Sequence, residues 1–219
     1  QERSLCNSVL ARLQGVNVPT YDRTAPSFEV GIVHLGFGGF HRGHLARYTH
    51  ELMQQNFAEN AKWGILGVGL MPQDQKVHDA LIPQDCLYSL VERSSADNET
   101  VSVIGSVRDI LYAADDAGKE TLLRTIGENS NVKIVSMTVT EHGYCLNSAT
   151  KKLNLDHPFI VHDLQHPRAP RSVVGILVEG YRRRKENGLH PFTSLSCDNI
   201  QHNGDLLRDA VLTFAACLD

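Results

Sequence analysis

Short apolar runs alternate with amphipathic stretches along most of the chain. Residues 30–35, 63–70, 132–139 and 192–197 are short runs of mostly apolar residues. Such runs are typical of strands that are buried on both faces of a parallel sheet. From 41 to 57, apolar residues recur at the spacing of a helix instead. The first run, the glycine-rich turn after it and this helix therefore predict the opening unit of a βαβ fold.

The rest of the chain continues the alternation. Residues 75–81 predict a short helix, and the apolar positions between 174 and 181 predict a longer one that ends at Gly188. The last turns of the longer helix contain the cationic run 182–185, which suits the helix dipole and which we interpret as a solvated helix end. Asn203 is the expected N-cap of a last helix.

Two β-prone runs interrupt this pattern. Residues 86–92 and 100–107 are joined by the polar residues 94–99 and predict a β-hairpin or edge insertion. The whole pattern predicts an α/β fold, with a Rossmann-like, doubly wound and mostly parallel sheet that carries this hairpin insertion. We expect one domain over residues 29–219, and a leader on its surface over the polar and irregular residues 1–28.

The composition narrows the class of protein. Of the 219 residues, 42% are hydrophobic and 21% are charged, as in ordinary globular proteins. The net charge of −4 provides no basic surface for nucleic acid, and the longest apolar run, 173–178, is too short to span a bilayer. Five scattered cysteines without a CxxC pair indicate reduced thiols rather than disulfides or a zinc site. We therefore expect a cytoplasmic protein that binds neither nucleic acid nor a membrane.

The turn after the first predicted strand contains the clearest chemistry. Gly36 and Gly38 allow a tight turn and a close approach of the backbone to a pyrophosphate, and Arg42 could add a bidentate phosphate contact. His41 stands where the third glycine of the common GxGxxG fingerprint would be. The pattern favours a dinucleotide site, and the alternative is a purely structural turn. His41 and His44 have no acid or cysteine at ligand spacing beside them, so no metal site is predicted.

Polar side chains also follow the later predicted strands. Asp74 is the first acid after the second strand, where NAD sites hold the adenosine ribose, and a solvated loop or helix N-cap is the alternative. The third run leads into Thr140 and Glu141, and the fourth leads into Asn199. The Asn199 amide could donate to a developing alkoxide, and an Asx turn is the alternative.

Several segments together resemble the polyol-specific long-chain dehydrogenase family. They occur in the family's order and span residues 30–215, nearly the whole chain. The matching segments are IVHLGFGGFHRGH (32–44), GVGL (67–70), QDCLY (84–88), VSMTVTE (135–141), SCDN (196–199) and HNG (202–204). In this family the dinucleotide fingerprint reads GxGxFHR, so the resemblance makes His41 an expected residue at its position.

The resemblance implies roles for individual residues. Asp74 matches a ribose-binding aspartate, which implies a preference for NAD over NADP, although the preceding position, often acidic in relatives, is Gln73. Asn199 matches an asparagine that stabilises the negative oxygen at the reacting carbon. The residues expected to bind the cofactor NAD are Gly36, Gly38, Gly39, Phe40, His41, Arg42, Asp74, Thr140 and Glu141.

The reaction that the resemblance implies is metal-independent, reversible hydride transfer between C2 of D-mannitol and NAD, giving D-fructose and NADH. Fructuronate reductase and D-arabinitol 4-dehydrogenase activities are the alternatives within the family, and a non-catalytic dinucleotide-binding module is the alternative from another class. Family members carry a lysine base, in a Lys-x4-Asn-x2-His pattern, on a second, mainly helical domain. No lysine here is followed by that spacing. We therefore expect this helical substrate domain, with the base and most substrate contacts, to lie outside the 219 residues.

Overall fold

A parallel sheet of five strands forms the centre of the molecule. The computed structural model describes residues 5–95, 98–139 and 143–218. The strands of the sheet are β1 (Val30–Leu35), β2 (Gly64–Gly69), β5 (Val107–Tyr112), β6 (Ile134–Met137) and β7 (Thr193–Ser196). They lie in the order β5-β2-β1-β6-β7, and every neighbouring pair is parallel. Counted along the chain this order is 3-2-1-4-5, as in a Rossmann fold, and the predicted fold class is confirmed.

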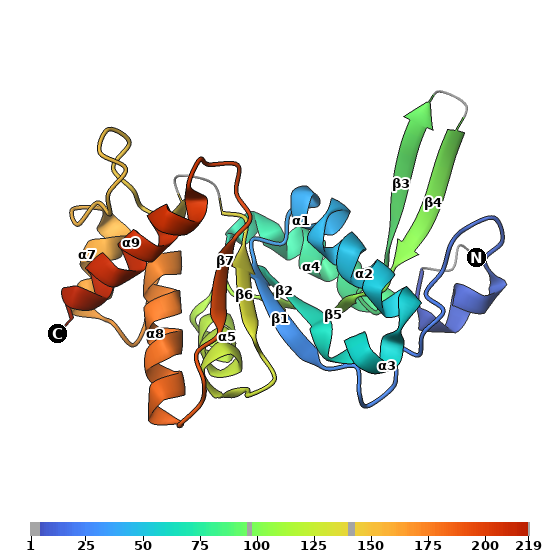
Figure 1. Ribbon diagram of the computed structural model, residues 1–219, viewed down its shortest axis with the longest axis horizontal. Helices are drawn as coiled ribbons and strands as arrows, with labels where there is room; N and C mark the ends of the chain where they lie inside the picture. The colour runs from blue at the N-terminus through green and yellow to red at the C-terminus, as the bar shows by residue number, and fades with distance from the viewer. Residues whose placement is uncertain (1–4, 96–97, 140–142, 219) are drawn as a thin grey trace.

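Helices lie on both sides of this sheet (Figure 1). The α-helices of the described residues are α1 (Gly39–Gly43), α2 (Leu45–Gln55), α3 (Phe57–Asn60), α4 (Gln75–Leu81), α5 (Asp116–Glu128), α7 (Pro158–Gln165), α8 (Val173–Glu186) and α9 (Asn203–Ala216). Short 3₁₀ turns are η1 (Asn7–Arg12), η2 (Ala61–Trp63), η3 (Pro72–Asp74) and η4 (Ile82–Gln84).

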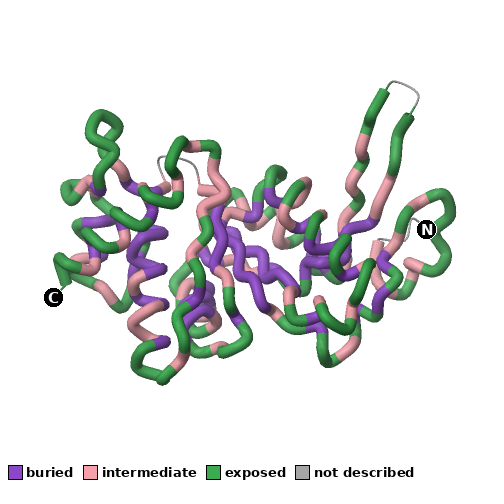
Figure 2. The backbone as a smooth tube through the Cα atoms, viewed as in Figure 1, coloured by how far each residue is buried: buried purple, intermediate pink, exposed green. Residues whose placement is uncertain are grey.

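The central strand β1 supplies side chains to the hydrophobic cores on both faces. Val33 and Leu35 pack in the core that includes α5 and α8, whereas Ile32 packs in the core that includes α2 and α4. Successive strand residues point to opposite faces, so a strand with helices on both sides must be apolar throughout. Figure 2 shows the resulting band of buried residues along the strands at the centre of the molecule.

The predicted hairpin is present. Strands β3 (Tyr88–Ser95) and β4 (Asn98–Ile104) pair in antiparallel fashion and project from the body of the molecule (Figure 1). Its strands extend into 94–99, which the sequence pattern assigned to the linker. The second predicted run, 100–107, was wrong at its end: β4 ends at Ile104, Gly105 and Ser106 follow it, and Val107 begins β5 in the main sheet.

Other expectations need correction. The predicted helix over 41–57 is divided by His44 and Asn56 into α1, α2 and the start of α3. Asn203 is the first residue of α9 rather than its N-cap. Arg184 is buried rather than solvated. Its guanidinium donates to the carbonyls of Ile126, Asn129 and Val132, at and after the end of α5, and to that of His190 after α8.

The segment before β1 is anchored to the domain. Tyr21, Arg23 and Phe28 are buried, and Arg23 donates to the carbonyls of Gly105 and Val107. A surface leader therefore describes only part of residues 5–28, while the domain boundary at residue 28 stays a prediction. Within the described ranges, no helix is long and apolar enough to cross a membrane.

Candidate functional site

The glycine turn begins directly after β1. Gly36 has a φ of +88°, a conformation that side chains other than glycine rarely adopt. A Cβ at this position would lie 2.3 Å from the carbonyl oxygen of Thr138, which follows β6. The Gly36 N–H donates to the Val68 carbonyl of β2 at 3.0 Å. The turn is therefore held between two neighbouring strands, and its geometry requires glycine at position 36.

Gly38 and Gly39 differ from Gly36 because nothing in the described structure crowds them. A Cβ on Gly38 would meet only the Gly36 oxygen, at 3.8 Å, and a Cβ on Gly39 would meet no atom within 4 Å. Gly38 is the N-cap of the five-residue helix α1, and the first N–H groups of a helix have no intrahelical partners. Open space beside unpaired backbone donors suits a pyrophosphate group, which is the fit that the fingerprint predicts.

His41 occupies the contact between helix and strand that the third glycine makes in the common fingerprint. Its ring stacks on that of His34 in β1, with centroids 3.5 Å apart, and only 1% of the residue is exposed. His34 is hydrogen-bonded to Ser136 and Thr138, but neither ring nitrogen of His41 has a partner among the described residues. Burial lowers the pKa of His34 to about 3 and that of His41 to about 2, so both rings are neutral.

The two neighbours of His41 lie closer to the surface. Arg42 donates from Nη1 to the Phe37 carbonyl at 2.9 Å, and its backbone carbonyl accepts the hydroxyl of Tyr88 from the hairpin at 2.7 Å. Phe40 is 58% exposed, and its ring lies 4.3 Å from that of His44. Phe40 is therefore accessible beside the open space at Gly39, whereas His41 lies beneath the turn.

Asp74 ends the turn η3 and packs against the end of β2, where the sequence predicts a ribose-binding residue. Its Oδ2 accepts the Met71 N–H at 3.0 Å, and no side-chain cap of α4 is formed. A Cβ on Gly69 would lie 2.6 Å from the Cβ of Asp74, so glycine at position 69 lets Asp74 pack against the end of the strand. Asp74 occupies the N-cap position of α4, but its side chain forms no cap bond there. Its second carboxylate oxygen has no hydrogen bond to a described residue and is available to a ligand.

The loop after β7 contains Asn199. Asn199 is exposed, and its side chain has no hydrogen bond to a described residue, so no Asx turn is seen. The preceding Asp198 accepts the Val139 N–H at 3.2 Å and the hydroxyl of Tyr144. Thr140 and Glu141 lie outside the described residues, and their cofactor role stays a prediction.

The strand register brings these segments to one edge of the sheet, which we call the carboxyl edge. Leu35 pairs with Val68 on one side and with Met137 on the other, and Met137 pairs with Ser196. Gly36 follows β1 directly, Asp74 lies in η3 after β2, and Asn199 lies in the loop after β7. Sequence reasoning missed Thr138 and Tyr144, whose roles depend on contacts between distant segments.

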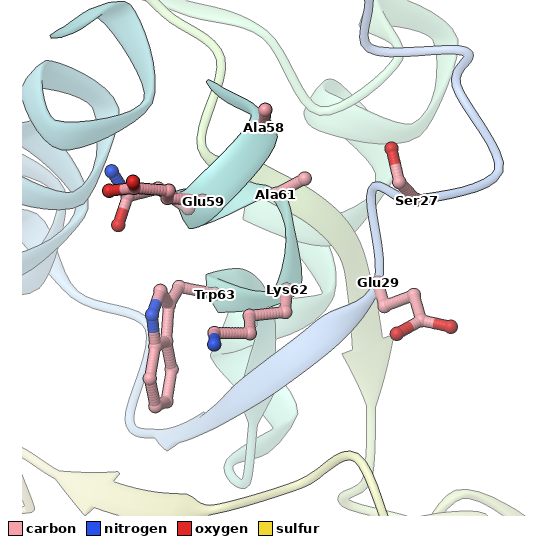
Figure 3. A pocket seen from close by; sticks show the side chains of 8 residues that line it. Ser27, Glu29, Ala58, Glu59, Ala61, Lys62 and Trp63 are labelled. Carbon is pink, nitrogen blue, oxygen red and sulfur yellow. The ribbon is translucent and has the colours of Figure 1, made fainter. Parts of the chain in front are cut away.

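A surface hollow of about 700 Å³ lies at the opposite end of the strands. Its lining includes Glu29 before β1, and Lys62 and Trp63 before β2 (Figure 3). The Lys62 ammonium lies 5.8 Å from the Trp63 ring, while Glu29 points away from them. Ligands of open α/β sheets bind at the carboxyl ends of the strands, and none of the candidate residues lines this hollow. No group of three potential metal ligands is found in the described part of the chain.

Comparison with known proteins gives consistent matches. A family model described as the mannitol dehydrogenase Rossmann domain matches residues 30–218. Mannitol 2-dehydrogenase of Pyrenophora tritici-repentis is 46% identical over 94% of this chain and 35% of its own length. Mannitol dehydrogenase 2 of Saccharomyces cerevisiae is 43% identical over 90% of this chain and 38% of its own length. The chain thus spans well under half the length of these relatives.

Two solved structures have the same fold. The Pseudomonas fluorescens mannitol 2-dehydrogenase in ternary complex with NAD and D-mannitol has a TM-score of 0.91 and 39% identity, covering 99% of this chain and 43% of that one. A D-sorbitol dehydrogenase in substrate-free form has a TM-score of 0.89 and 36% identity, with the same coverage.

Proposed function

The chain belongs to the mannitol dehydrogenase family, and from this premise we propose that it is the NAD-binding part of an enzyme that interconverts D-mannitol and D-fructose. The observation that carries the proposal is the position of Gly36, Asp74 and Asn199 at the same, carboxyl edge of a sheet with Rossmann order. This edge at the centre of such a sheet is where dinucleotides bind. The relatives named for mannitol and the structure with NAD and D-mannitol support the choice of ligands.

Each part of the carboxyl edge would bind one part of the dinucleotide. The backbone at Gly38 and Gly39 approaches the pyrophosphate, because no side chain intervenes. The carboxylate oxygen of Asp74 that does not bind Met71 accepts hydrogen bonds from the ribose hydroxyls. The same negative charge repels the additional phosphate of NADP, so we propose a preference for NAD.

The reacting carbon would lie near Asn199. When bound, NAD supplies the hydride chemistry, while the protein provides orientation and electrostatic stabilisation. The exposed Asn199 amide donates to the oxygen at C2 and stabilises its negative charge as the hydroxyl proton leaves. The base that accepts this proton is expected from residues outside this chain, since no lysine here has the family's spacing.

The compartment is part of the proposal. All five cysteines are free thiols in the structure, and two of them, Cys86 and Cys145, are buried. Free thiols are typical of proteins in a reducing compartment, and we therefore propose a cytosolic location.

Isothermal titration of NAD and of NADP into the chain tests the cofactor site. We expect binding of NAD with weaker binding of NADP. A folded chain, verified by circular dichroism, that binds neither nucleotide would refute the proposal at its first step.

The substrate is tested with the full-length protein. We expect NADH formation, followed by absorbance, with D-mannitol as the preferred substrate in a panel that also contains D-sorbitol, D-arabinitol and, in the reverse direction, fructuronate. Preference for another member of the panel would reassign the substrate within the family. NAD binding without turnover of any of them would favour a non-catalytic dinucleotide-binding module.

A further inference from the structure

We propose that Tyr144, acting through Asp198, is a positioning residue for Asn199. The inference rests on the proposed function, because it concerns the geometry of the group that would donate to the reacting oxygen. Among the described residues, the Tyr144 hydroxyl bonds Ser196 and Asp198, and no hydrogen bond joins it to Asn199 or to the glycine turn. Its effect on the reaction would therefore come only through the loop after β7.

The hydroxyl of Tyr144 joins the end of β7 to the loop. It donates to Oδ2 of Asp198 and is hydrogen-bonded to Oγ of Ser196 at 2.8 Å, and only 3% of Tyr144 is exposed. Burial raises the pKa of Tyr144, and the bond to Asp198 raises it further. The hydroxyl thus keeps its proton, and it remains a donor to Asp198.

Asp198 connects the loop to the neighbouring strand. Its Oδ2 also accepts the backbone N–H of Val139, at 3.2 Å, so the side chain continues the contacts between β6 and β7 beyond the last strand residues. From the other side, the Asn203 amide donates to the carbonyls of Ser196 and Asp198, at 3.2 and 2.9 Å. The backbone on the N-terminal side of Asn199 is therefore held by the side chains of Tyr144, Asp198 and Asn203.

Asn199 depends on this framework because its own side chain is exposed and has no bond to a described residue. Its amide can be placed only by the backbone that carries it. The framework also reaches the cofactor turn, because the Thr138 hydroxyl donates to the Gly36 carbonyl at 2.9 Å and Val139 follows Thr138. One connected set of contacts thus sets the position of Asn199 relative to the glycine turn.

The chain offers a matched pair of variants to test the inference. Tyr144→Phe removes the hydroxyl that bonds Ser196, whereas the control Tyr181→Phe removes one that bonds Ser194, on the same strand, at 2.7 Å. In the full-length protein we expect Tyr144→Phe to lower kcat about 10- to 100-fold, because small misplacements of catalytic groups cost factors of this size. The KM for NAD and the melting temperature should stay close to wild type, and Tyr181→Phe should leave kcat within about twofold.

A double-mutant cycle separates positioning from general destabilisation. If Tyr144 acts through Asn199, Tyr144→Phe should cost little further activity in an Asn199→Ala background. The inference is overturned if the losses of kcat from the two substitutions multiply in the double variant. It is also overturned if Tyr144→Phe and Tyr181→Phe lower kcat equally, or if Asn199→Ala retains full activity.

Hydrogen exchange gives a readout that does not depend on turnover. Amides in the peptide 197–202 should exchange faster in Tyr144→Phe than in wild type, and should be unchanged in Tyr181→Phe. Unchanged exchange in Tyr144→Phe would overturn the inference whatever the activity. Failure of the proposed function itself would give a different result. The wild-type protein would turn over no polyol, while the amides of 197–202 would still exchange faster in Tyr144→Phe than in wild type.

Discussion

The two ends of the sheet use glycine for different purposes. At the amino ends of the strands, a Cβ on Gly31 would lie 2.1 Å from the Lys62 carbonyl oxygen, and one on Gly64 would lie 2.4 Å from that of Glu29. At the carboxyl ends, Cβ atoms on Gly38 and Gly39 would meet almost nothing. The folded structure itself therefore explains the glycines at the amino ends, but not Gly38 and Gly39.

This difference shows how a ligand site can be recognised from the surroundings of its glycines. A glycine that the surrounding atoms demand is part of the fold, as are Gly31 and Gly64. A glycine that faces open space next to backbone donors leaves room for something else. At Gly36 both the nearby Thr138 carbonyl and the positive φ require glycine. Because Gly36 also begins the glycine turn, it belongs to the fold and to the site together.

The largest effect expected from this comparison is on stability at the amino ends. Gly31→Ala should lower the free energy of unfolding by about 3 kcal/mol, because the new methyl group overlaps the Lys62 carbonyl and the backbone must shift. Urea denaturation measures the effect. Gly204→Ala is the control, since a Cβ there meets nothing and alanine favours the helix α9. Equal free energies of unfolding for Gly31→Ala and Gly204→Ala would contradict the claim that close packing requires glycine at the amino ends.

At the carboxyl edge, Gly38→Ala should have the opposite profile. We expect the free energy of unfolding to stay within about 0.5 kcal/mol of wild type, because Gly38 has a φ of −83° and free space around it. The affinity for NAD should fall about a hundredfold, or about 2.8 kcal/mol, because the methyl group separates the backbone from the phosphates. Titration calorimetry measures this, with Gly43→Ala in the same helix as control. Unchanged affinity for NAD in Gly38→Ala would argue against a pyrophosphate site beside Gly38.

Asp74→Asn should have a smaller effect on the affinity for NAD than Gly38→Ala. We expect about a tenfold loss of NAD affinity, or about 1.4 kcal/mol, because a neutral amide accepts hydrogen bonds from the ribose more weakly than a carboxylate. The affinity for NADP should fall less, so the ratio of the two dissociation constants should shrink. Asp79→Asn, on the exposed side of α4, is the control. A constant ratio in Asp74→Asn would argue against the ribose role.

The smallest predicted effect concerns the histidine pair beneath the turn. The pKa of His41 is about 2 and that of His34 about 3 in the folded state, against about 6.5 in an unfolded chain. The unfolded state therefore binds more protons below pH 6.5, and stability is lost as the pH falls. Each histidine should contribute about 1 kcal/mol of this loss between pH 6.5 and 5.5.

His41→Phe tests this prediction through the slope of stability against pH. The variant should retain a ring that can stack on His34, and its unfolding free energy should fall less steeply below pH 6.5 than that of wild type. Parallel curves for wild type and variant would mean that the pKa of His41 is the same in the folded and unfolded states, against the prediction.

Most of the fold could be predicted because its signals are local. Four of the five sheet strands are apolar runs, and the hairpin is marked by its polar link. β5 was missed because it is an edge strand, whose Arg108 and Asp109 interrupt the apolar pattern. The helix α5 was missed although the sequence contains its signals, since Asp115 caps it by accepting the Gly118 N–H and Leu122, Leu123 and Ile126 are buried.

In the candidate site, the residues that follow predicted strands could be predicted, whereas the contacts between distant segments could not. Gly36, Gly38 and Asp74 follow strands that the apolar pattern already indicates. The stacking of His41 on His34 was not predictable, because it depends on how α1 lies against β1. The bond between Tyr144 and Asp198 joins residues 54 positions apart, and no sequence spacing indicates such a contact. The burial of Arg184 has the same cause, since three of its four carbonyl partners lie at or after the end of the distant helix α5.

The pairing of β1 with β6 also bears on how the protein folds. His34 and Ser136 face each other across this pair and are 102 positions apart in the chain. Contacts between such distant segments form late, because a long loop must close before they stabilise the chain. The Thr138 carbonyl packs against Gly36 only once this pair is in register. The glycine turn thus gains its final shape in the step that joins the two halves of the sheet, so a dinucleotide would stabilise the completed domain rather than either half.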